Sequence, residues 1–344
     1  MLFPRHRATL NSAMKTAAAV LALVATLAPS FLLAAQAPEP GAAPTASPTP
    51  PTTPAGAAGQ VPPTPLAYKT WPEVNLNALV TDKHGIPQTV DPHGFQLSED
   101  GAERPLRLPA AADSPISLAF LIDFSGSTFE HTAEIVSAVK TIVHSLPAES
   151  EVTVTDVSSG LPFLDVPLTA ASRADLSVLD KLKPNGSTAL WDTLLATEDY
   201  FAAEAKFPRR AIVIFSDGLD NASSVAIGTA YTKMEQPGAP LVYTCFVSKI
   251  VYLPSRYGRL NLKRLAKDGG GLEFEFNTDL RVDPDSAAAA AVGAKIAAAI
   301  NHQSVVQFTA ANTTRDGKPR KLKLQLPDKD QQVHSLATYF APDK

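Results

Sequence analysis

Between residues 116 and 300, short apolar runs alternate regularly with helical patterns, and few folds accommodate such an order. The run ISLAFLID at 116–123 is apolar on both faces, as a central strand of a parallel sheet is. Apolar residues three to four apart follow it from Ile135 to Leu146, which predicts an amphipathic helix. Strands alternating with helices predict an α/β fold with a doubly wound, mostly parallel sheet covered on both faces.

The same reasoning assigns the other elements of this region. Pro167 weakens strand 164–168 as a central strand, so we expect this strand to be antiparallel at one edge. A helix capped by Ser172 and Asp175 is expected to end near Leu182. Cys245, the only cysteine, falls within a strand and excludes both a disulfide framework and a Cys-rich zinc module. The remaining expected strands are 152–157, 211–217, 241–247 and 272–276, and the remaining helices begin at 189, 224, 259 and 284.

Two segments with β-strand patterns flank the α/β region. Residues 66–112 alternate in the manner of strands and contain the turn Glu99-Asp100-Gly101, whereas residues 303–344 contain the strictly alternating KLKLQL. Each segment is close to the lower size limit for folding alone without disulfides. We therefore expect the two to pair into one β-sandwich, with the α/β domain inserted between them. The alternative is that each packs separately onto the α/β domain.

The N-terminal part has a different composition. Residues 16–37 carry no charge and follow Arg5, Arg7 and Lys15, the order typical of a secretory signal, so residues 1–37 are predicted to be a signal peptide. An uncleaved signal anchor is the alternative, because the stretch approaches the length that spans a bilayer. Residues 38–65 hold 10 of the 30 prolines and few large apolar residues, which predicts a disordered linker.

Export and charge restrict the expected location and partners. The predicted signal indicates a secreted, periplasmic or cell-envelope protein, with attachment through the signal left open and no membrane insertion of the mature chain. The formal net charge is −4, from 30 Lys and Arg against 34 Asp and Glu. Nucleic acids and anionic membranes attract basic surfaces, so neither is an expected partner.

Three loops rich in side-chain oxygens are predicted at one edge of the sheet. Strands 116–122 and 211–215 are expected to be neighbours where the strand order reverses, which is where open α/β sheets bind ligands. Two carboxylates and three hydroxyls, without a nearby histidine or thiol, suit Mg²⁺ or Mn²⁺ and not Zn²⁺. The loops are Asp123-Phe124-Ser125-Gly126-Ser127, Asn185-Gly186-Ser187-Thr188 and Ser216-Asp217-Gly218.

This arrangement resembles the von Willebrand factor type A domain and its metal-ion-dependent adhesion site. Asp123, Ser125 and Ser127 match the family's Asp-x-Ser-x-Ser pattern, while Thr188 and Asp217 match its loop threonine and later aspartate. The resemblance implies such a domain over residues 113–302. More narrowly, the chain resembles exported acidobacterial proteins of this type, which share its Glu-Asp-Gly turn and the Arg-Asp-Gly-Lys motif found here at residues 315–318.

The resemblance implies that Ser125, Ser127 and Thr188 ligate the ion directly, while one or both aspartates act through water. Such an ion stays electrophilic and can accept an acidic side chain from a protein partner. The expected function is thus metal-dependent, adhesion-type protein binding, and not catalysis. The alternatives are aspartates that only cap helices, a vestigial site that works without metal, and a hydrolase with an unrecognised site.

Other potentially reactive residues carry weaker signals. Ser137 and Lys140 match S-x-x-K, but they fall within a predicted helix and lack the accompanying motifs. Whether the helix at 284–300 shifts to change affinity is left open by the sequence. The scattered histidines are expected at the surface or in turns, namely His84, His93, His131, His144, His302 and His334.

Overall fold

The computed structural model describes residues 71–157, 163–183, 186–247, 253–276 and 285–343. The chain divides into two compact units, residues 1–57 and 58–344, and every described residue belongs to the second. The predicted signal peptide and linker, as well as Asn185, lie outside the described residues. Within the described ranges, none of the helices combines the length and the apolar character needed to cross a membrane.

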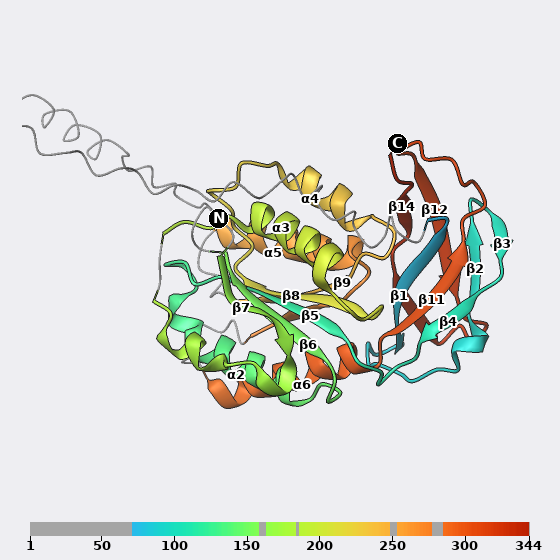
Figure 1. Ribbon diagram of the computed structural model, residues 1–344. Helices are drawn as coiled ribbons and strands as arrows, with labels where there is room; N and C mark the ends of the chain where they lie inside the picture. Colours follow the sequence, from blue (N-terminus) through green and yellow to red (C-terminus); the bar gives the residue numbers. More distant parts are fainter. Residues whose placement is uncertain (1–70, 158–162, 184–185, 248–252, 277–284, 344) are drawn as a thin grey trace, which may run out of the picture. The chain divides into compact units, whose positions relative to one another are not determined.

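A six-stranded sheet in the order β10-β9-β8-β5-β6-β7 forms the centre of the α/β domain (Figure 1). Strand β7 pairs antiparallel with β6, and all other neighbours in this sheet are parallel. This order confirms the predicted doubly wound fold with one antiparallel edge strand. The strands are β5 (Ser117–Ile122), β6 (Glu151–Asp156), β7 (Phe163–Ala170), β8 (Arg210–Ser216), β9 (Leu241–Phe246) and β10 (Glu273–Glu275).

Helices cover both faces of this sheet (Figure 1). Alternate residues of β5 enter two different cores: Phe120 packs with residues of the α2–α6 side, and Leu121 with residues of the α3–α4–α5 side. A strand buried on both faces in this way is apolar at nearly every position, which explains the apolar run at 118–122. The buried Ser117 hydroxyl is satisfied by donating to Glu151 at 2.7 Å. The helices are α2 (Thr132–His144), α3 (Leu190–Glu204), α4 (Ile227–Met234), α5 (Leu253–Asp268) and α6 (Ser286–Asn301).

Two predicted helices differ from the observed ones. The expected helix ending near Leu182 is wrong: it is replaced by two 3₁₀ turns, η3 (Ala171–Arg173) and η4 (Leu176–Lys181). Asp175 caps η4 by accepting a hydrogen bond from Ser177 N at 3.0 Å, but Ser172 lies inside η3 and caps nothing. Helix α5 begins at Leu253 instead of 259, because Pro254 occupies the first turn, where its missing N–H has no cost.

The N- and C-terminal β segments share two four-stranded antiparallel sheets, ordered β13-β1-β11-β4 and β14-β12-β2-β3. Strand β1 pairs with β11 and β13, and β2 pairs with β12, so the predicted pairing of the two segments is confirmed. One apolar cluster, including Leu76, Leu97 and Phe308, joins both sheets. The strands are β1 (Glu73–Asp82), β2 (Gln96–Glu99), β3 (Ala102–Arg104), β4 (Arg107–Ala110), β11 (Ser304–Thr309), β12 (Pro319–Gln325), β13 (Gln331–Ser335) and β14 (Thr338–Phe340).

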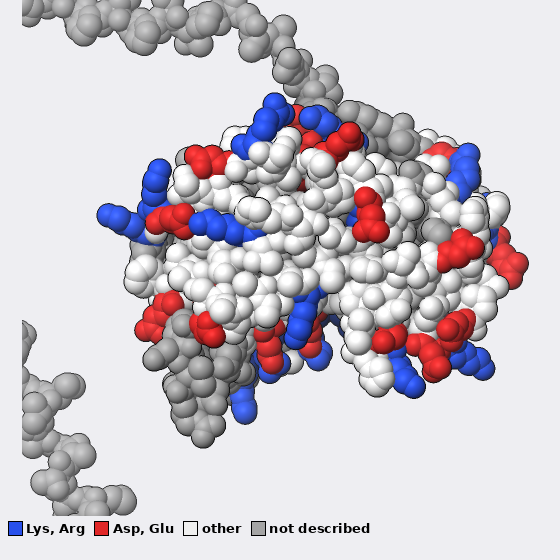
Figure 2. Space-filling view, turned by 90° about the horizontal axis from the view of Figure 1, so that it is seen from below, with Lys and Arg blue, Asp and Glu red and all other residues white. Residues whose placement is uncertain are grey.

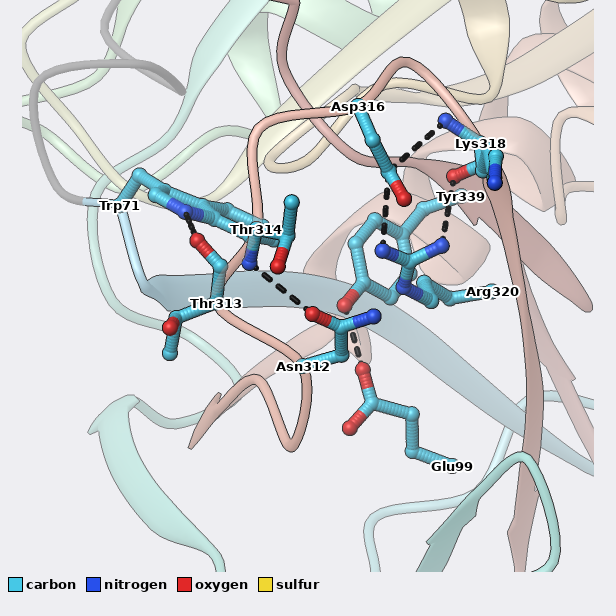
Figure 3. A network of polar contacts seen from close by, with 9 residues as sticks. All are labelled: Trp71, Glu99, Asn312, Thr313, Thr314, Asp316, Lys318, Arg320 and Tyr339. Carbon is cyan, nitrogen blue, oxygen red and sulfur yellow. Dashed lines mark hydrogen bonds and ion pairs between the residues drawn. The ribbon is translucent and has the colours of Figure 1, made fainter.

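A buried polar network closes the β-sandwich (Figure 3). Glu99, which is 1% exposed, accepts hydrogen bonds from the Tyr339 hydroxyl and from Ala311 N. Arg320, 5% exposed, donates to Asp316 Oδ1 at 2.9 Å. The Glu-Asp-Gly turn and the Arg-Asp-Gly-Lys segment therefore each contribute a residue to this network, and their role in the described structure is to hold the sandwich together.

The sandwich is hydrogen-bonded to the amino ends of the α/β strands. Asn77 Oδ1 on β1 accepts from Arg210 N at 3.1 Å, and Asn77 Nδ2 donates to Ala239 O at 3.0 Å. Arg210 begins β8 and Ala239 precedes β9, so these contacts lie at the edge opposite to the carboxyl ends of the strands. The buried Arg209 donates to Ile300 O at 2.6 Å and thereby holds the last turn of α6, where a cation is favourable.

Charges of both signs are interspersed on the face of the molecule seen in Figure 2, and neither sign gathers into a single patch there. This distribution accords with the small net charge of the sequence. A face of this kind offers no extended basic surface of the type that binds nucleic acid.

Candidate functional site

The strand order reverses between β5 and β8, and the candidate site begins at this point. The two strands are parallel neighbours, and Asp123 N–H, directly after β5, donates to Phe215 O on β8 at 2.9 Å. Asp217 directly follows β8. The predicted adjacency of strands 116–122 and 211–215 is confirmed, and the loops that carry the two aspartates leave the sheet side by side.

The first loop is organised around the Asp123 carboxylate, which is fully buried. Its Oδ1 accepts from Ser125 N at 3.0 Å, and its Oδ2 accepts from Ser216 Oγ at 2.7 Å. The Ser125 and Ser127 hydroxyl oxygens lie 3.1 Å apart. Behind them, the buried Thr128 hydroxyl donates to backbone oxygens of the same loop. Asp123 therefore shapes the loop that presents both serine hydroxyls.

Asp217 is as buried as Asp123, but its carboxylate oxygens accept fewer hydrogen bonds. Its side chain is 1% exposed, and Oδ1 accepts from Leu219 N at 3.0 Å. Among the described residues, Oδ2 has no hydrogen-bond partner. Burial raises the pKa of Asp217, against opposing contributions from Leu219 N and the Ser127 hydroxyl, and the Ser127 hydroxyl does not reach Oδ2 in hydrogen-bonding geometry. A buried, unpartnered carboxylate oxygen is costly unless another group satisfies it.

The electrostatics of the pair favour a positive charge. Burial raises the pKa of Asp123 to about 6, against hydrogen bonds from Ser125 and Ser216 that lower it, and the charge of Asp217 raises it further. Burial also raises the pKa of Asp217. Two buried carboxylates that have no counter-charge among the described residues resist ionisation, and a bound cation reverses that resistance. The donor chemistry and the unpartnered Oδ2 thus fit a hard divalent cation.

The loop that contains Thr188 is hydrogen-bonded to the loop that follows Asp217. Thr188, 4% exposed, donates its N–H to Asn221 Oδ1 at 2.8 Å, and its carbonyl accepts from Asn221 N at 3.0 Å. Ala189 N donates to Val157 O at 2.8 Å, which anchors the same loop beyond the end of β6. All three predicted loops are therefore connected at the carboxyl edge of the sheet.

Sequence reasoning did not identify the residues that brace these loops. Asp220 Oδ2 accepts from Trp191 N at 3.1 Å, and Asp192 Oδ2 accepts from Ser224 N at 2.8 Å, so the β8–α4 loop is fastened to the start of α3. Asn221, which bonds to Thr188, is the third residue that braces the loops. Their partners lie about thirty positions away in the chain, and nothing in the local sequence distinguishes these residues from ordinary turn formers.

Two glycines set the position of Asp217 relative to α5. Gly218 has φ +74°, and a Cβ atom there would overlap Gly258 O. A Cβ atom at Gly258 would in turn overlap Asp217 O. Asn261 Nδ2 donates to Gly218 O at 3.2 Å. The second and third turns of α5 therefore rest directly on the loop that carries Asp217, an approach that only glycine permits.

Other candidate residues have structural contacts. His131 lies in the 3₁₀ turn η2 (Phe129–His131), as expected of a turn residue, but it is only 4% exposed and forms a hydrogen bond with Glu134 at the start of α2. Ser137 Oγ donates to Ser286 O at 2.8 Å and Lys140 pairs with Asp180 at 2.9 Å, so the S-x-x-K residues join α2 to its neighbours. Within the described ranges, no three His, Cys, Asp or Glu side chains form a metal-binding group.

No protein-family model matches the sequence, and a search of curated proteins finds no relative. Solved structures with similar folds do exist. They include the conserved hypothetical protein BatB from Bacteroides thetaiotaomicron (16% identity, TM-score 0.38, 53% of this chain and 97% of that chain), a von Willebrand factor type A protein from Catenulispora acidiphila (12%, 0.47, 73% and 74%) and the open conformation of the pilus adhesin SpaC from Lactobacillus rhamnosus GG (11%, 0.44, 75% and 42%).

At these identities the likeness concerns the fold alone. The fold class of the α/β domain is established independently by its strand order and by the antiparallel edge strand β7. A von Willebrand factor type A protein is among the structures found by the search.

Proposed function

We propose that this chain is an exported protein-binding module that holds Mg²⁺ or Mn²⁺ on Asp123, Ser125, Ser127, Thr188 and Asp217 and binds an acidic side chain of its partner there. The observation that carries this proposal is the buried Asp217 Oδ2, which lacks a partner among the described residues. It lies in a site where the neighbouring Asp123 also resists ionisation without a counter-charge. A divalent cation satisfies both groups.

The donor set explains why a partner is needed. Three of the five side chains are neutral hydroxyls, and oxygen donors of this kind suit Mg²⁺, which keeps several exchangeable water ligands. Ser127 is exposed to solvent, so the site opens at the first loop. A bound ion would supply the charge that attracts an external carboxylate, while Asp123 holds the serine hydroxyls in place through its bond to Ser125 N.

Helix or turn capping explains only part of the arrangement. Oδ1 of each aspartate accepts from a backbone N–H two residues later, as a capping side chain does. Capping leaves Asp217 Oδ2 unexplained, whereas a cation accounts for it. The set also lacks a histidine, the side chain that most often activates a serine nucleophile as its general base, so binding accounts for these residues better than hydrolysis does.

Calorimetry on the full chain tests the metal site. We expect Mg²⁺ or Mn²⁺ to bind with a dissociation constant on the order of micromolar to millimolar, as at weak extracellular cation sites. Asp217→Asn should abolish the heat, since it removes the charge of the unpartnered oxygen. Asp82→Asn is the matched control, because the Asp82 carboxylate already accepts from His84 N and Ile86 N in a turn of the β-sandwich. Equal heats from wild type and Asp217→Asn would refute the metal site.

The binding role needs a second measurement. Capture of proteins from a cell-envelope extract should be lost on adding EDTA and restored by Mg²⁺, and Asp217→Asn should capture none of the same proteins. Capture that is indifferent to the chelator would exclude metal-bridged adhesion. A site that binds no ion but still captures the same proteins would identify the vestigial alternative.

A further inference from the structure

A fully buried serine, Ser216, ends strand β8 directly before Asp217. After Arg210, which begins the strand, every other residue of β8 is apolar, and the strand is buried along its whole length. A hydroxyl in such a place costs free energy unless it is hydrogen-bonded. The presence of a serine at this position therefore has to be explained by the contacts that its hydroxyl makes.

The Ser216 hydroxyl forms two hydrogen bonds, one to each of the loops that carry an aspartate. Its Oγ donates to Asp123 Oδ2 at 2.7 Å, in the loop that follows β5. The same oxygen accepts from Gly218 N at 2.9 Å, in the loop that follows β8. Ser216 thus uses its proton and a lone pair within the protein and links the two loops directly.

The first of these bonds fixes the orientation of the Asp123 carboxylate. Asp123 Oδ1 accepts from Ser125 N at 3.0 Å, while Oδ2 accepts from Ser216. With a donor at each oxygen, the carboxylate is held against rotation about its Cβ–Cγ bond. Because the bond to Ser125 N also shapes the loop that presents the serine hydroxyls, the Ser216 hydroxyl helps to hold these hydroxyls in place.

The second bond fixes the backbone around Asp217. The residues on either side of Asp217, Ser216 and Gly218, are hydrogen-bonded to each other. Leu219 N holds Asp217 Oδ1 at 3.0 Å, and Oδ2 lacks a partner among the described residues. The Ser216 hydroxyl therefore sits at the one point where the backbone of Asp217 and the carboxylate of Asp123 are tied together.

We infer that Ser216 is a positioning residue of the candidate metal site, which holds Asp123 and Asp217 in place relative to each other without ligating the ion. This inference rests on the proposed function. Mg²⁺ demands near-ideal octahedral geometry at short distances, so it tolerates little displacement of the oxygen atoms around it. Residues that orient metal ligands accordingly contribute to metal affinity without touching the metal.

Ser117 provides a closely matched control. It is also fully buried and begins β5, the strand next to β8. Its Oγ donates to Glu151 Oε1 at 2.7 Å and accepts from Phe207 N at 3.2 Å. Ser117→Ala and Ser216→Ala therefore each remove one buried hydroxyl that bonds to a carboxylate and to a backbone N–H. Only Ser216 lies at the carboxyl edge of the sheet.

The two variants are compared in the full chain. In EDTA, urea denaturation should show similar losses of stability for both. Calorimetry should show that Ser216→Ala raises the dissociation constant of Mg²⁺ by about tenfold, whereas Ser117→Ala leaves it at the wild-type value. The electron paramagnetic resonance spectrum of bound Mn²⁺ reports the arrangement of its ligands, and it should change in Ser216→Ala alone.

Two results would overturn the inference while the metal site stands. Ser216→Ala could bind Mg²⁺ as tightly as wild type, or Ser117→Ala could weaken binding equally, which would trace the effect to stability alone. The absence of any Mg²⁺ heat in wild type would instead refute the proposed metal site, and the inference would fall with it. The wild-type titration therefore distinguishes the two failures.

Discussion

Two buried carboxylates, Glu99 in the β-sandwich and Asp217 at the sheet edge, are both 1% exposed but have opposite surroundings. Both oxygens of Glu99 have hydrogen-bond donors, from Tyr339 and Ala311, and Arg104 lies 4.0 Å away. Asp217 has one backbone donor and one unpartnered oxygen within the described structure. These two acids are therefore distinguished by hydrogen-bond satisfaction and not by burial.

The difference extends to the two regions around these residues. The sandwich network joins strands from both ends of the chain, and its buried members Glu99, Arg320 and Tyr339 bond to other residues of the sandwich (Figure 3). The carboxyl edge of the α/β sheet instead gathers hydroxyls and carboxylates on loops that are braced from behind by Asp192, Asp220 and Asn221. The β-sandwich uses its polar groups to hold the fold together, whereas the carboxyl edge of the α/β sheet leaves polar groups available to a ligand.

The largest effect should come from deleting each acid in turn. Glu99→Ala leaves Ala311 N and the Tyr339 hydroxyl buried without an acceptor, so we expect a loss of about 3 kcal/mol in unfolding free energy. Asp217→Ala removes an unsatisfied charge, and in EDTA it should change the unfolding free energy by less than about 1 kcal/mol. Urea denaturation of both variants measures the contrast. Similar losses from the two variants would show that Asp217 is structural as well.

A second, smaller effect is the pH dependence of the metal-free protein. The pKa of Asp123 is raised from 3.8 to about 6, so the folded state binds more protons than the unfolded state between these values. The contribution of Asp123 to the unfolding free energy is therefore fully present below pH 4 and is lost as pH rises through 6, a loss of up to about 3 kcal/mol. In EDTA, the unfolding free energy of wild type should therefore decrease relative to that of Asp123→Asn as pH rises from 4 to 7, as measured by urea denaturation.

Asp175 provides the control with the opposite sign. Its pKa is lowered, chiefly by the hydrogen bonds it accepts from Ser177, so its contribution is present at neutral pH and lost as pH falls. The difference in unfolding free energy between wild type and Asp175→Asn should therefore shrink as pH falls, with wild type the more stable protein at neutral pH. The difference between wild type and Asp123→Asn should also shrink in acid, but there the variant is the more stable protein at neutral pH. A difference between wild type and Asp123→Asn that does not vary with pH would contradict the buried environment described for Asp123.

The sequence predicted the strands of the α/β domain well, because a strand buried on both faces is apolar at nearly every position, as 118–122 is. It also predicted that 66–112 and 303–344 pair, since neither is large enough to form a core alone. The start of α5 was missed because Pro254 and Gly258 read locally as loop residues. Gly258 is in fact required by its contact with Asp217, a contact that only the tertiary structure reveals.

The candidate site divides in the same way. Motif spacing and strand ends led us to propose Asp123, Ser125, Ser127, Thr188 and Asp217, and the structure connects the loops that carry them at one edge of the sheet. The bracing residues were not found, since an Asn or Asp in a turn most often bonds to its own neighbours. Their long-range bonds to Thr188, Trp191 and Ser224 depend on how the loops fold against each other.

The smallest expected effect tests the bracing residues that sequence reasoning did not identify. Asn221→Ala removes the side-chain acceptor of Thr188 N while leaving the backbone bond from Asn221 N to Thr188 O in place. Residues that orient metal ligands typically contribute 10- to 100-fold in affinity, so we expect calorimetry to show Mg²⁺ binding weakened by about tenfold. Loss of one partly buried hydrogen bond should lower unfolding free energy by only about 1 kcal/mol. Ser224→Ala, which removes a hydroxyl bonded to Asp192 on the far side of the same loop, should leave the affinity unchanged. If both variants weaken Mg²⁺ binding equally, the β8–α4 loop acts as a whole, and Asn221 has no particular role in placing Thr188.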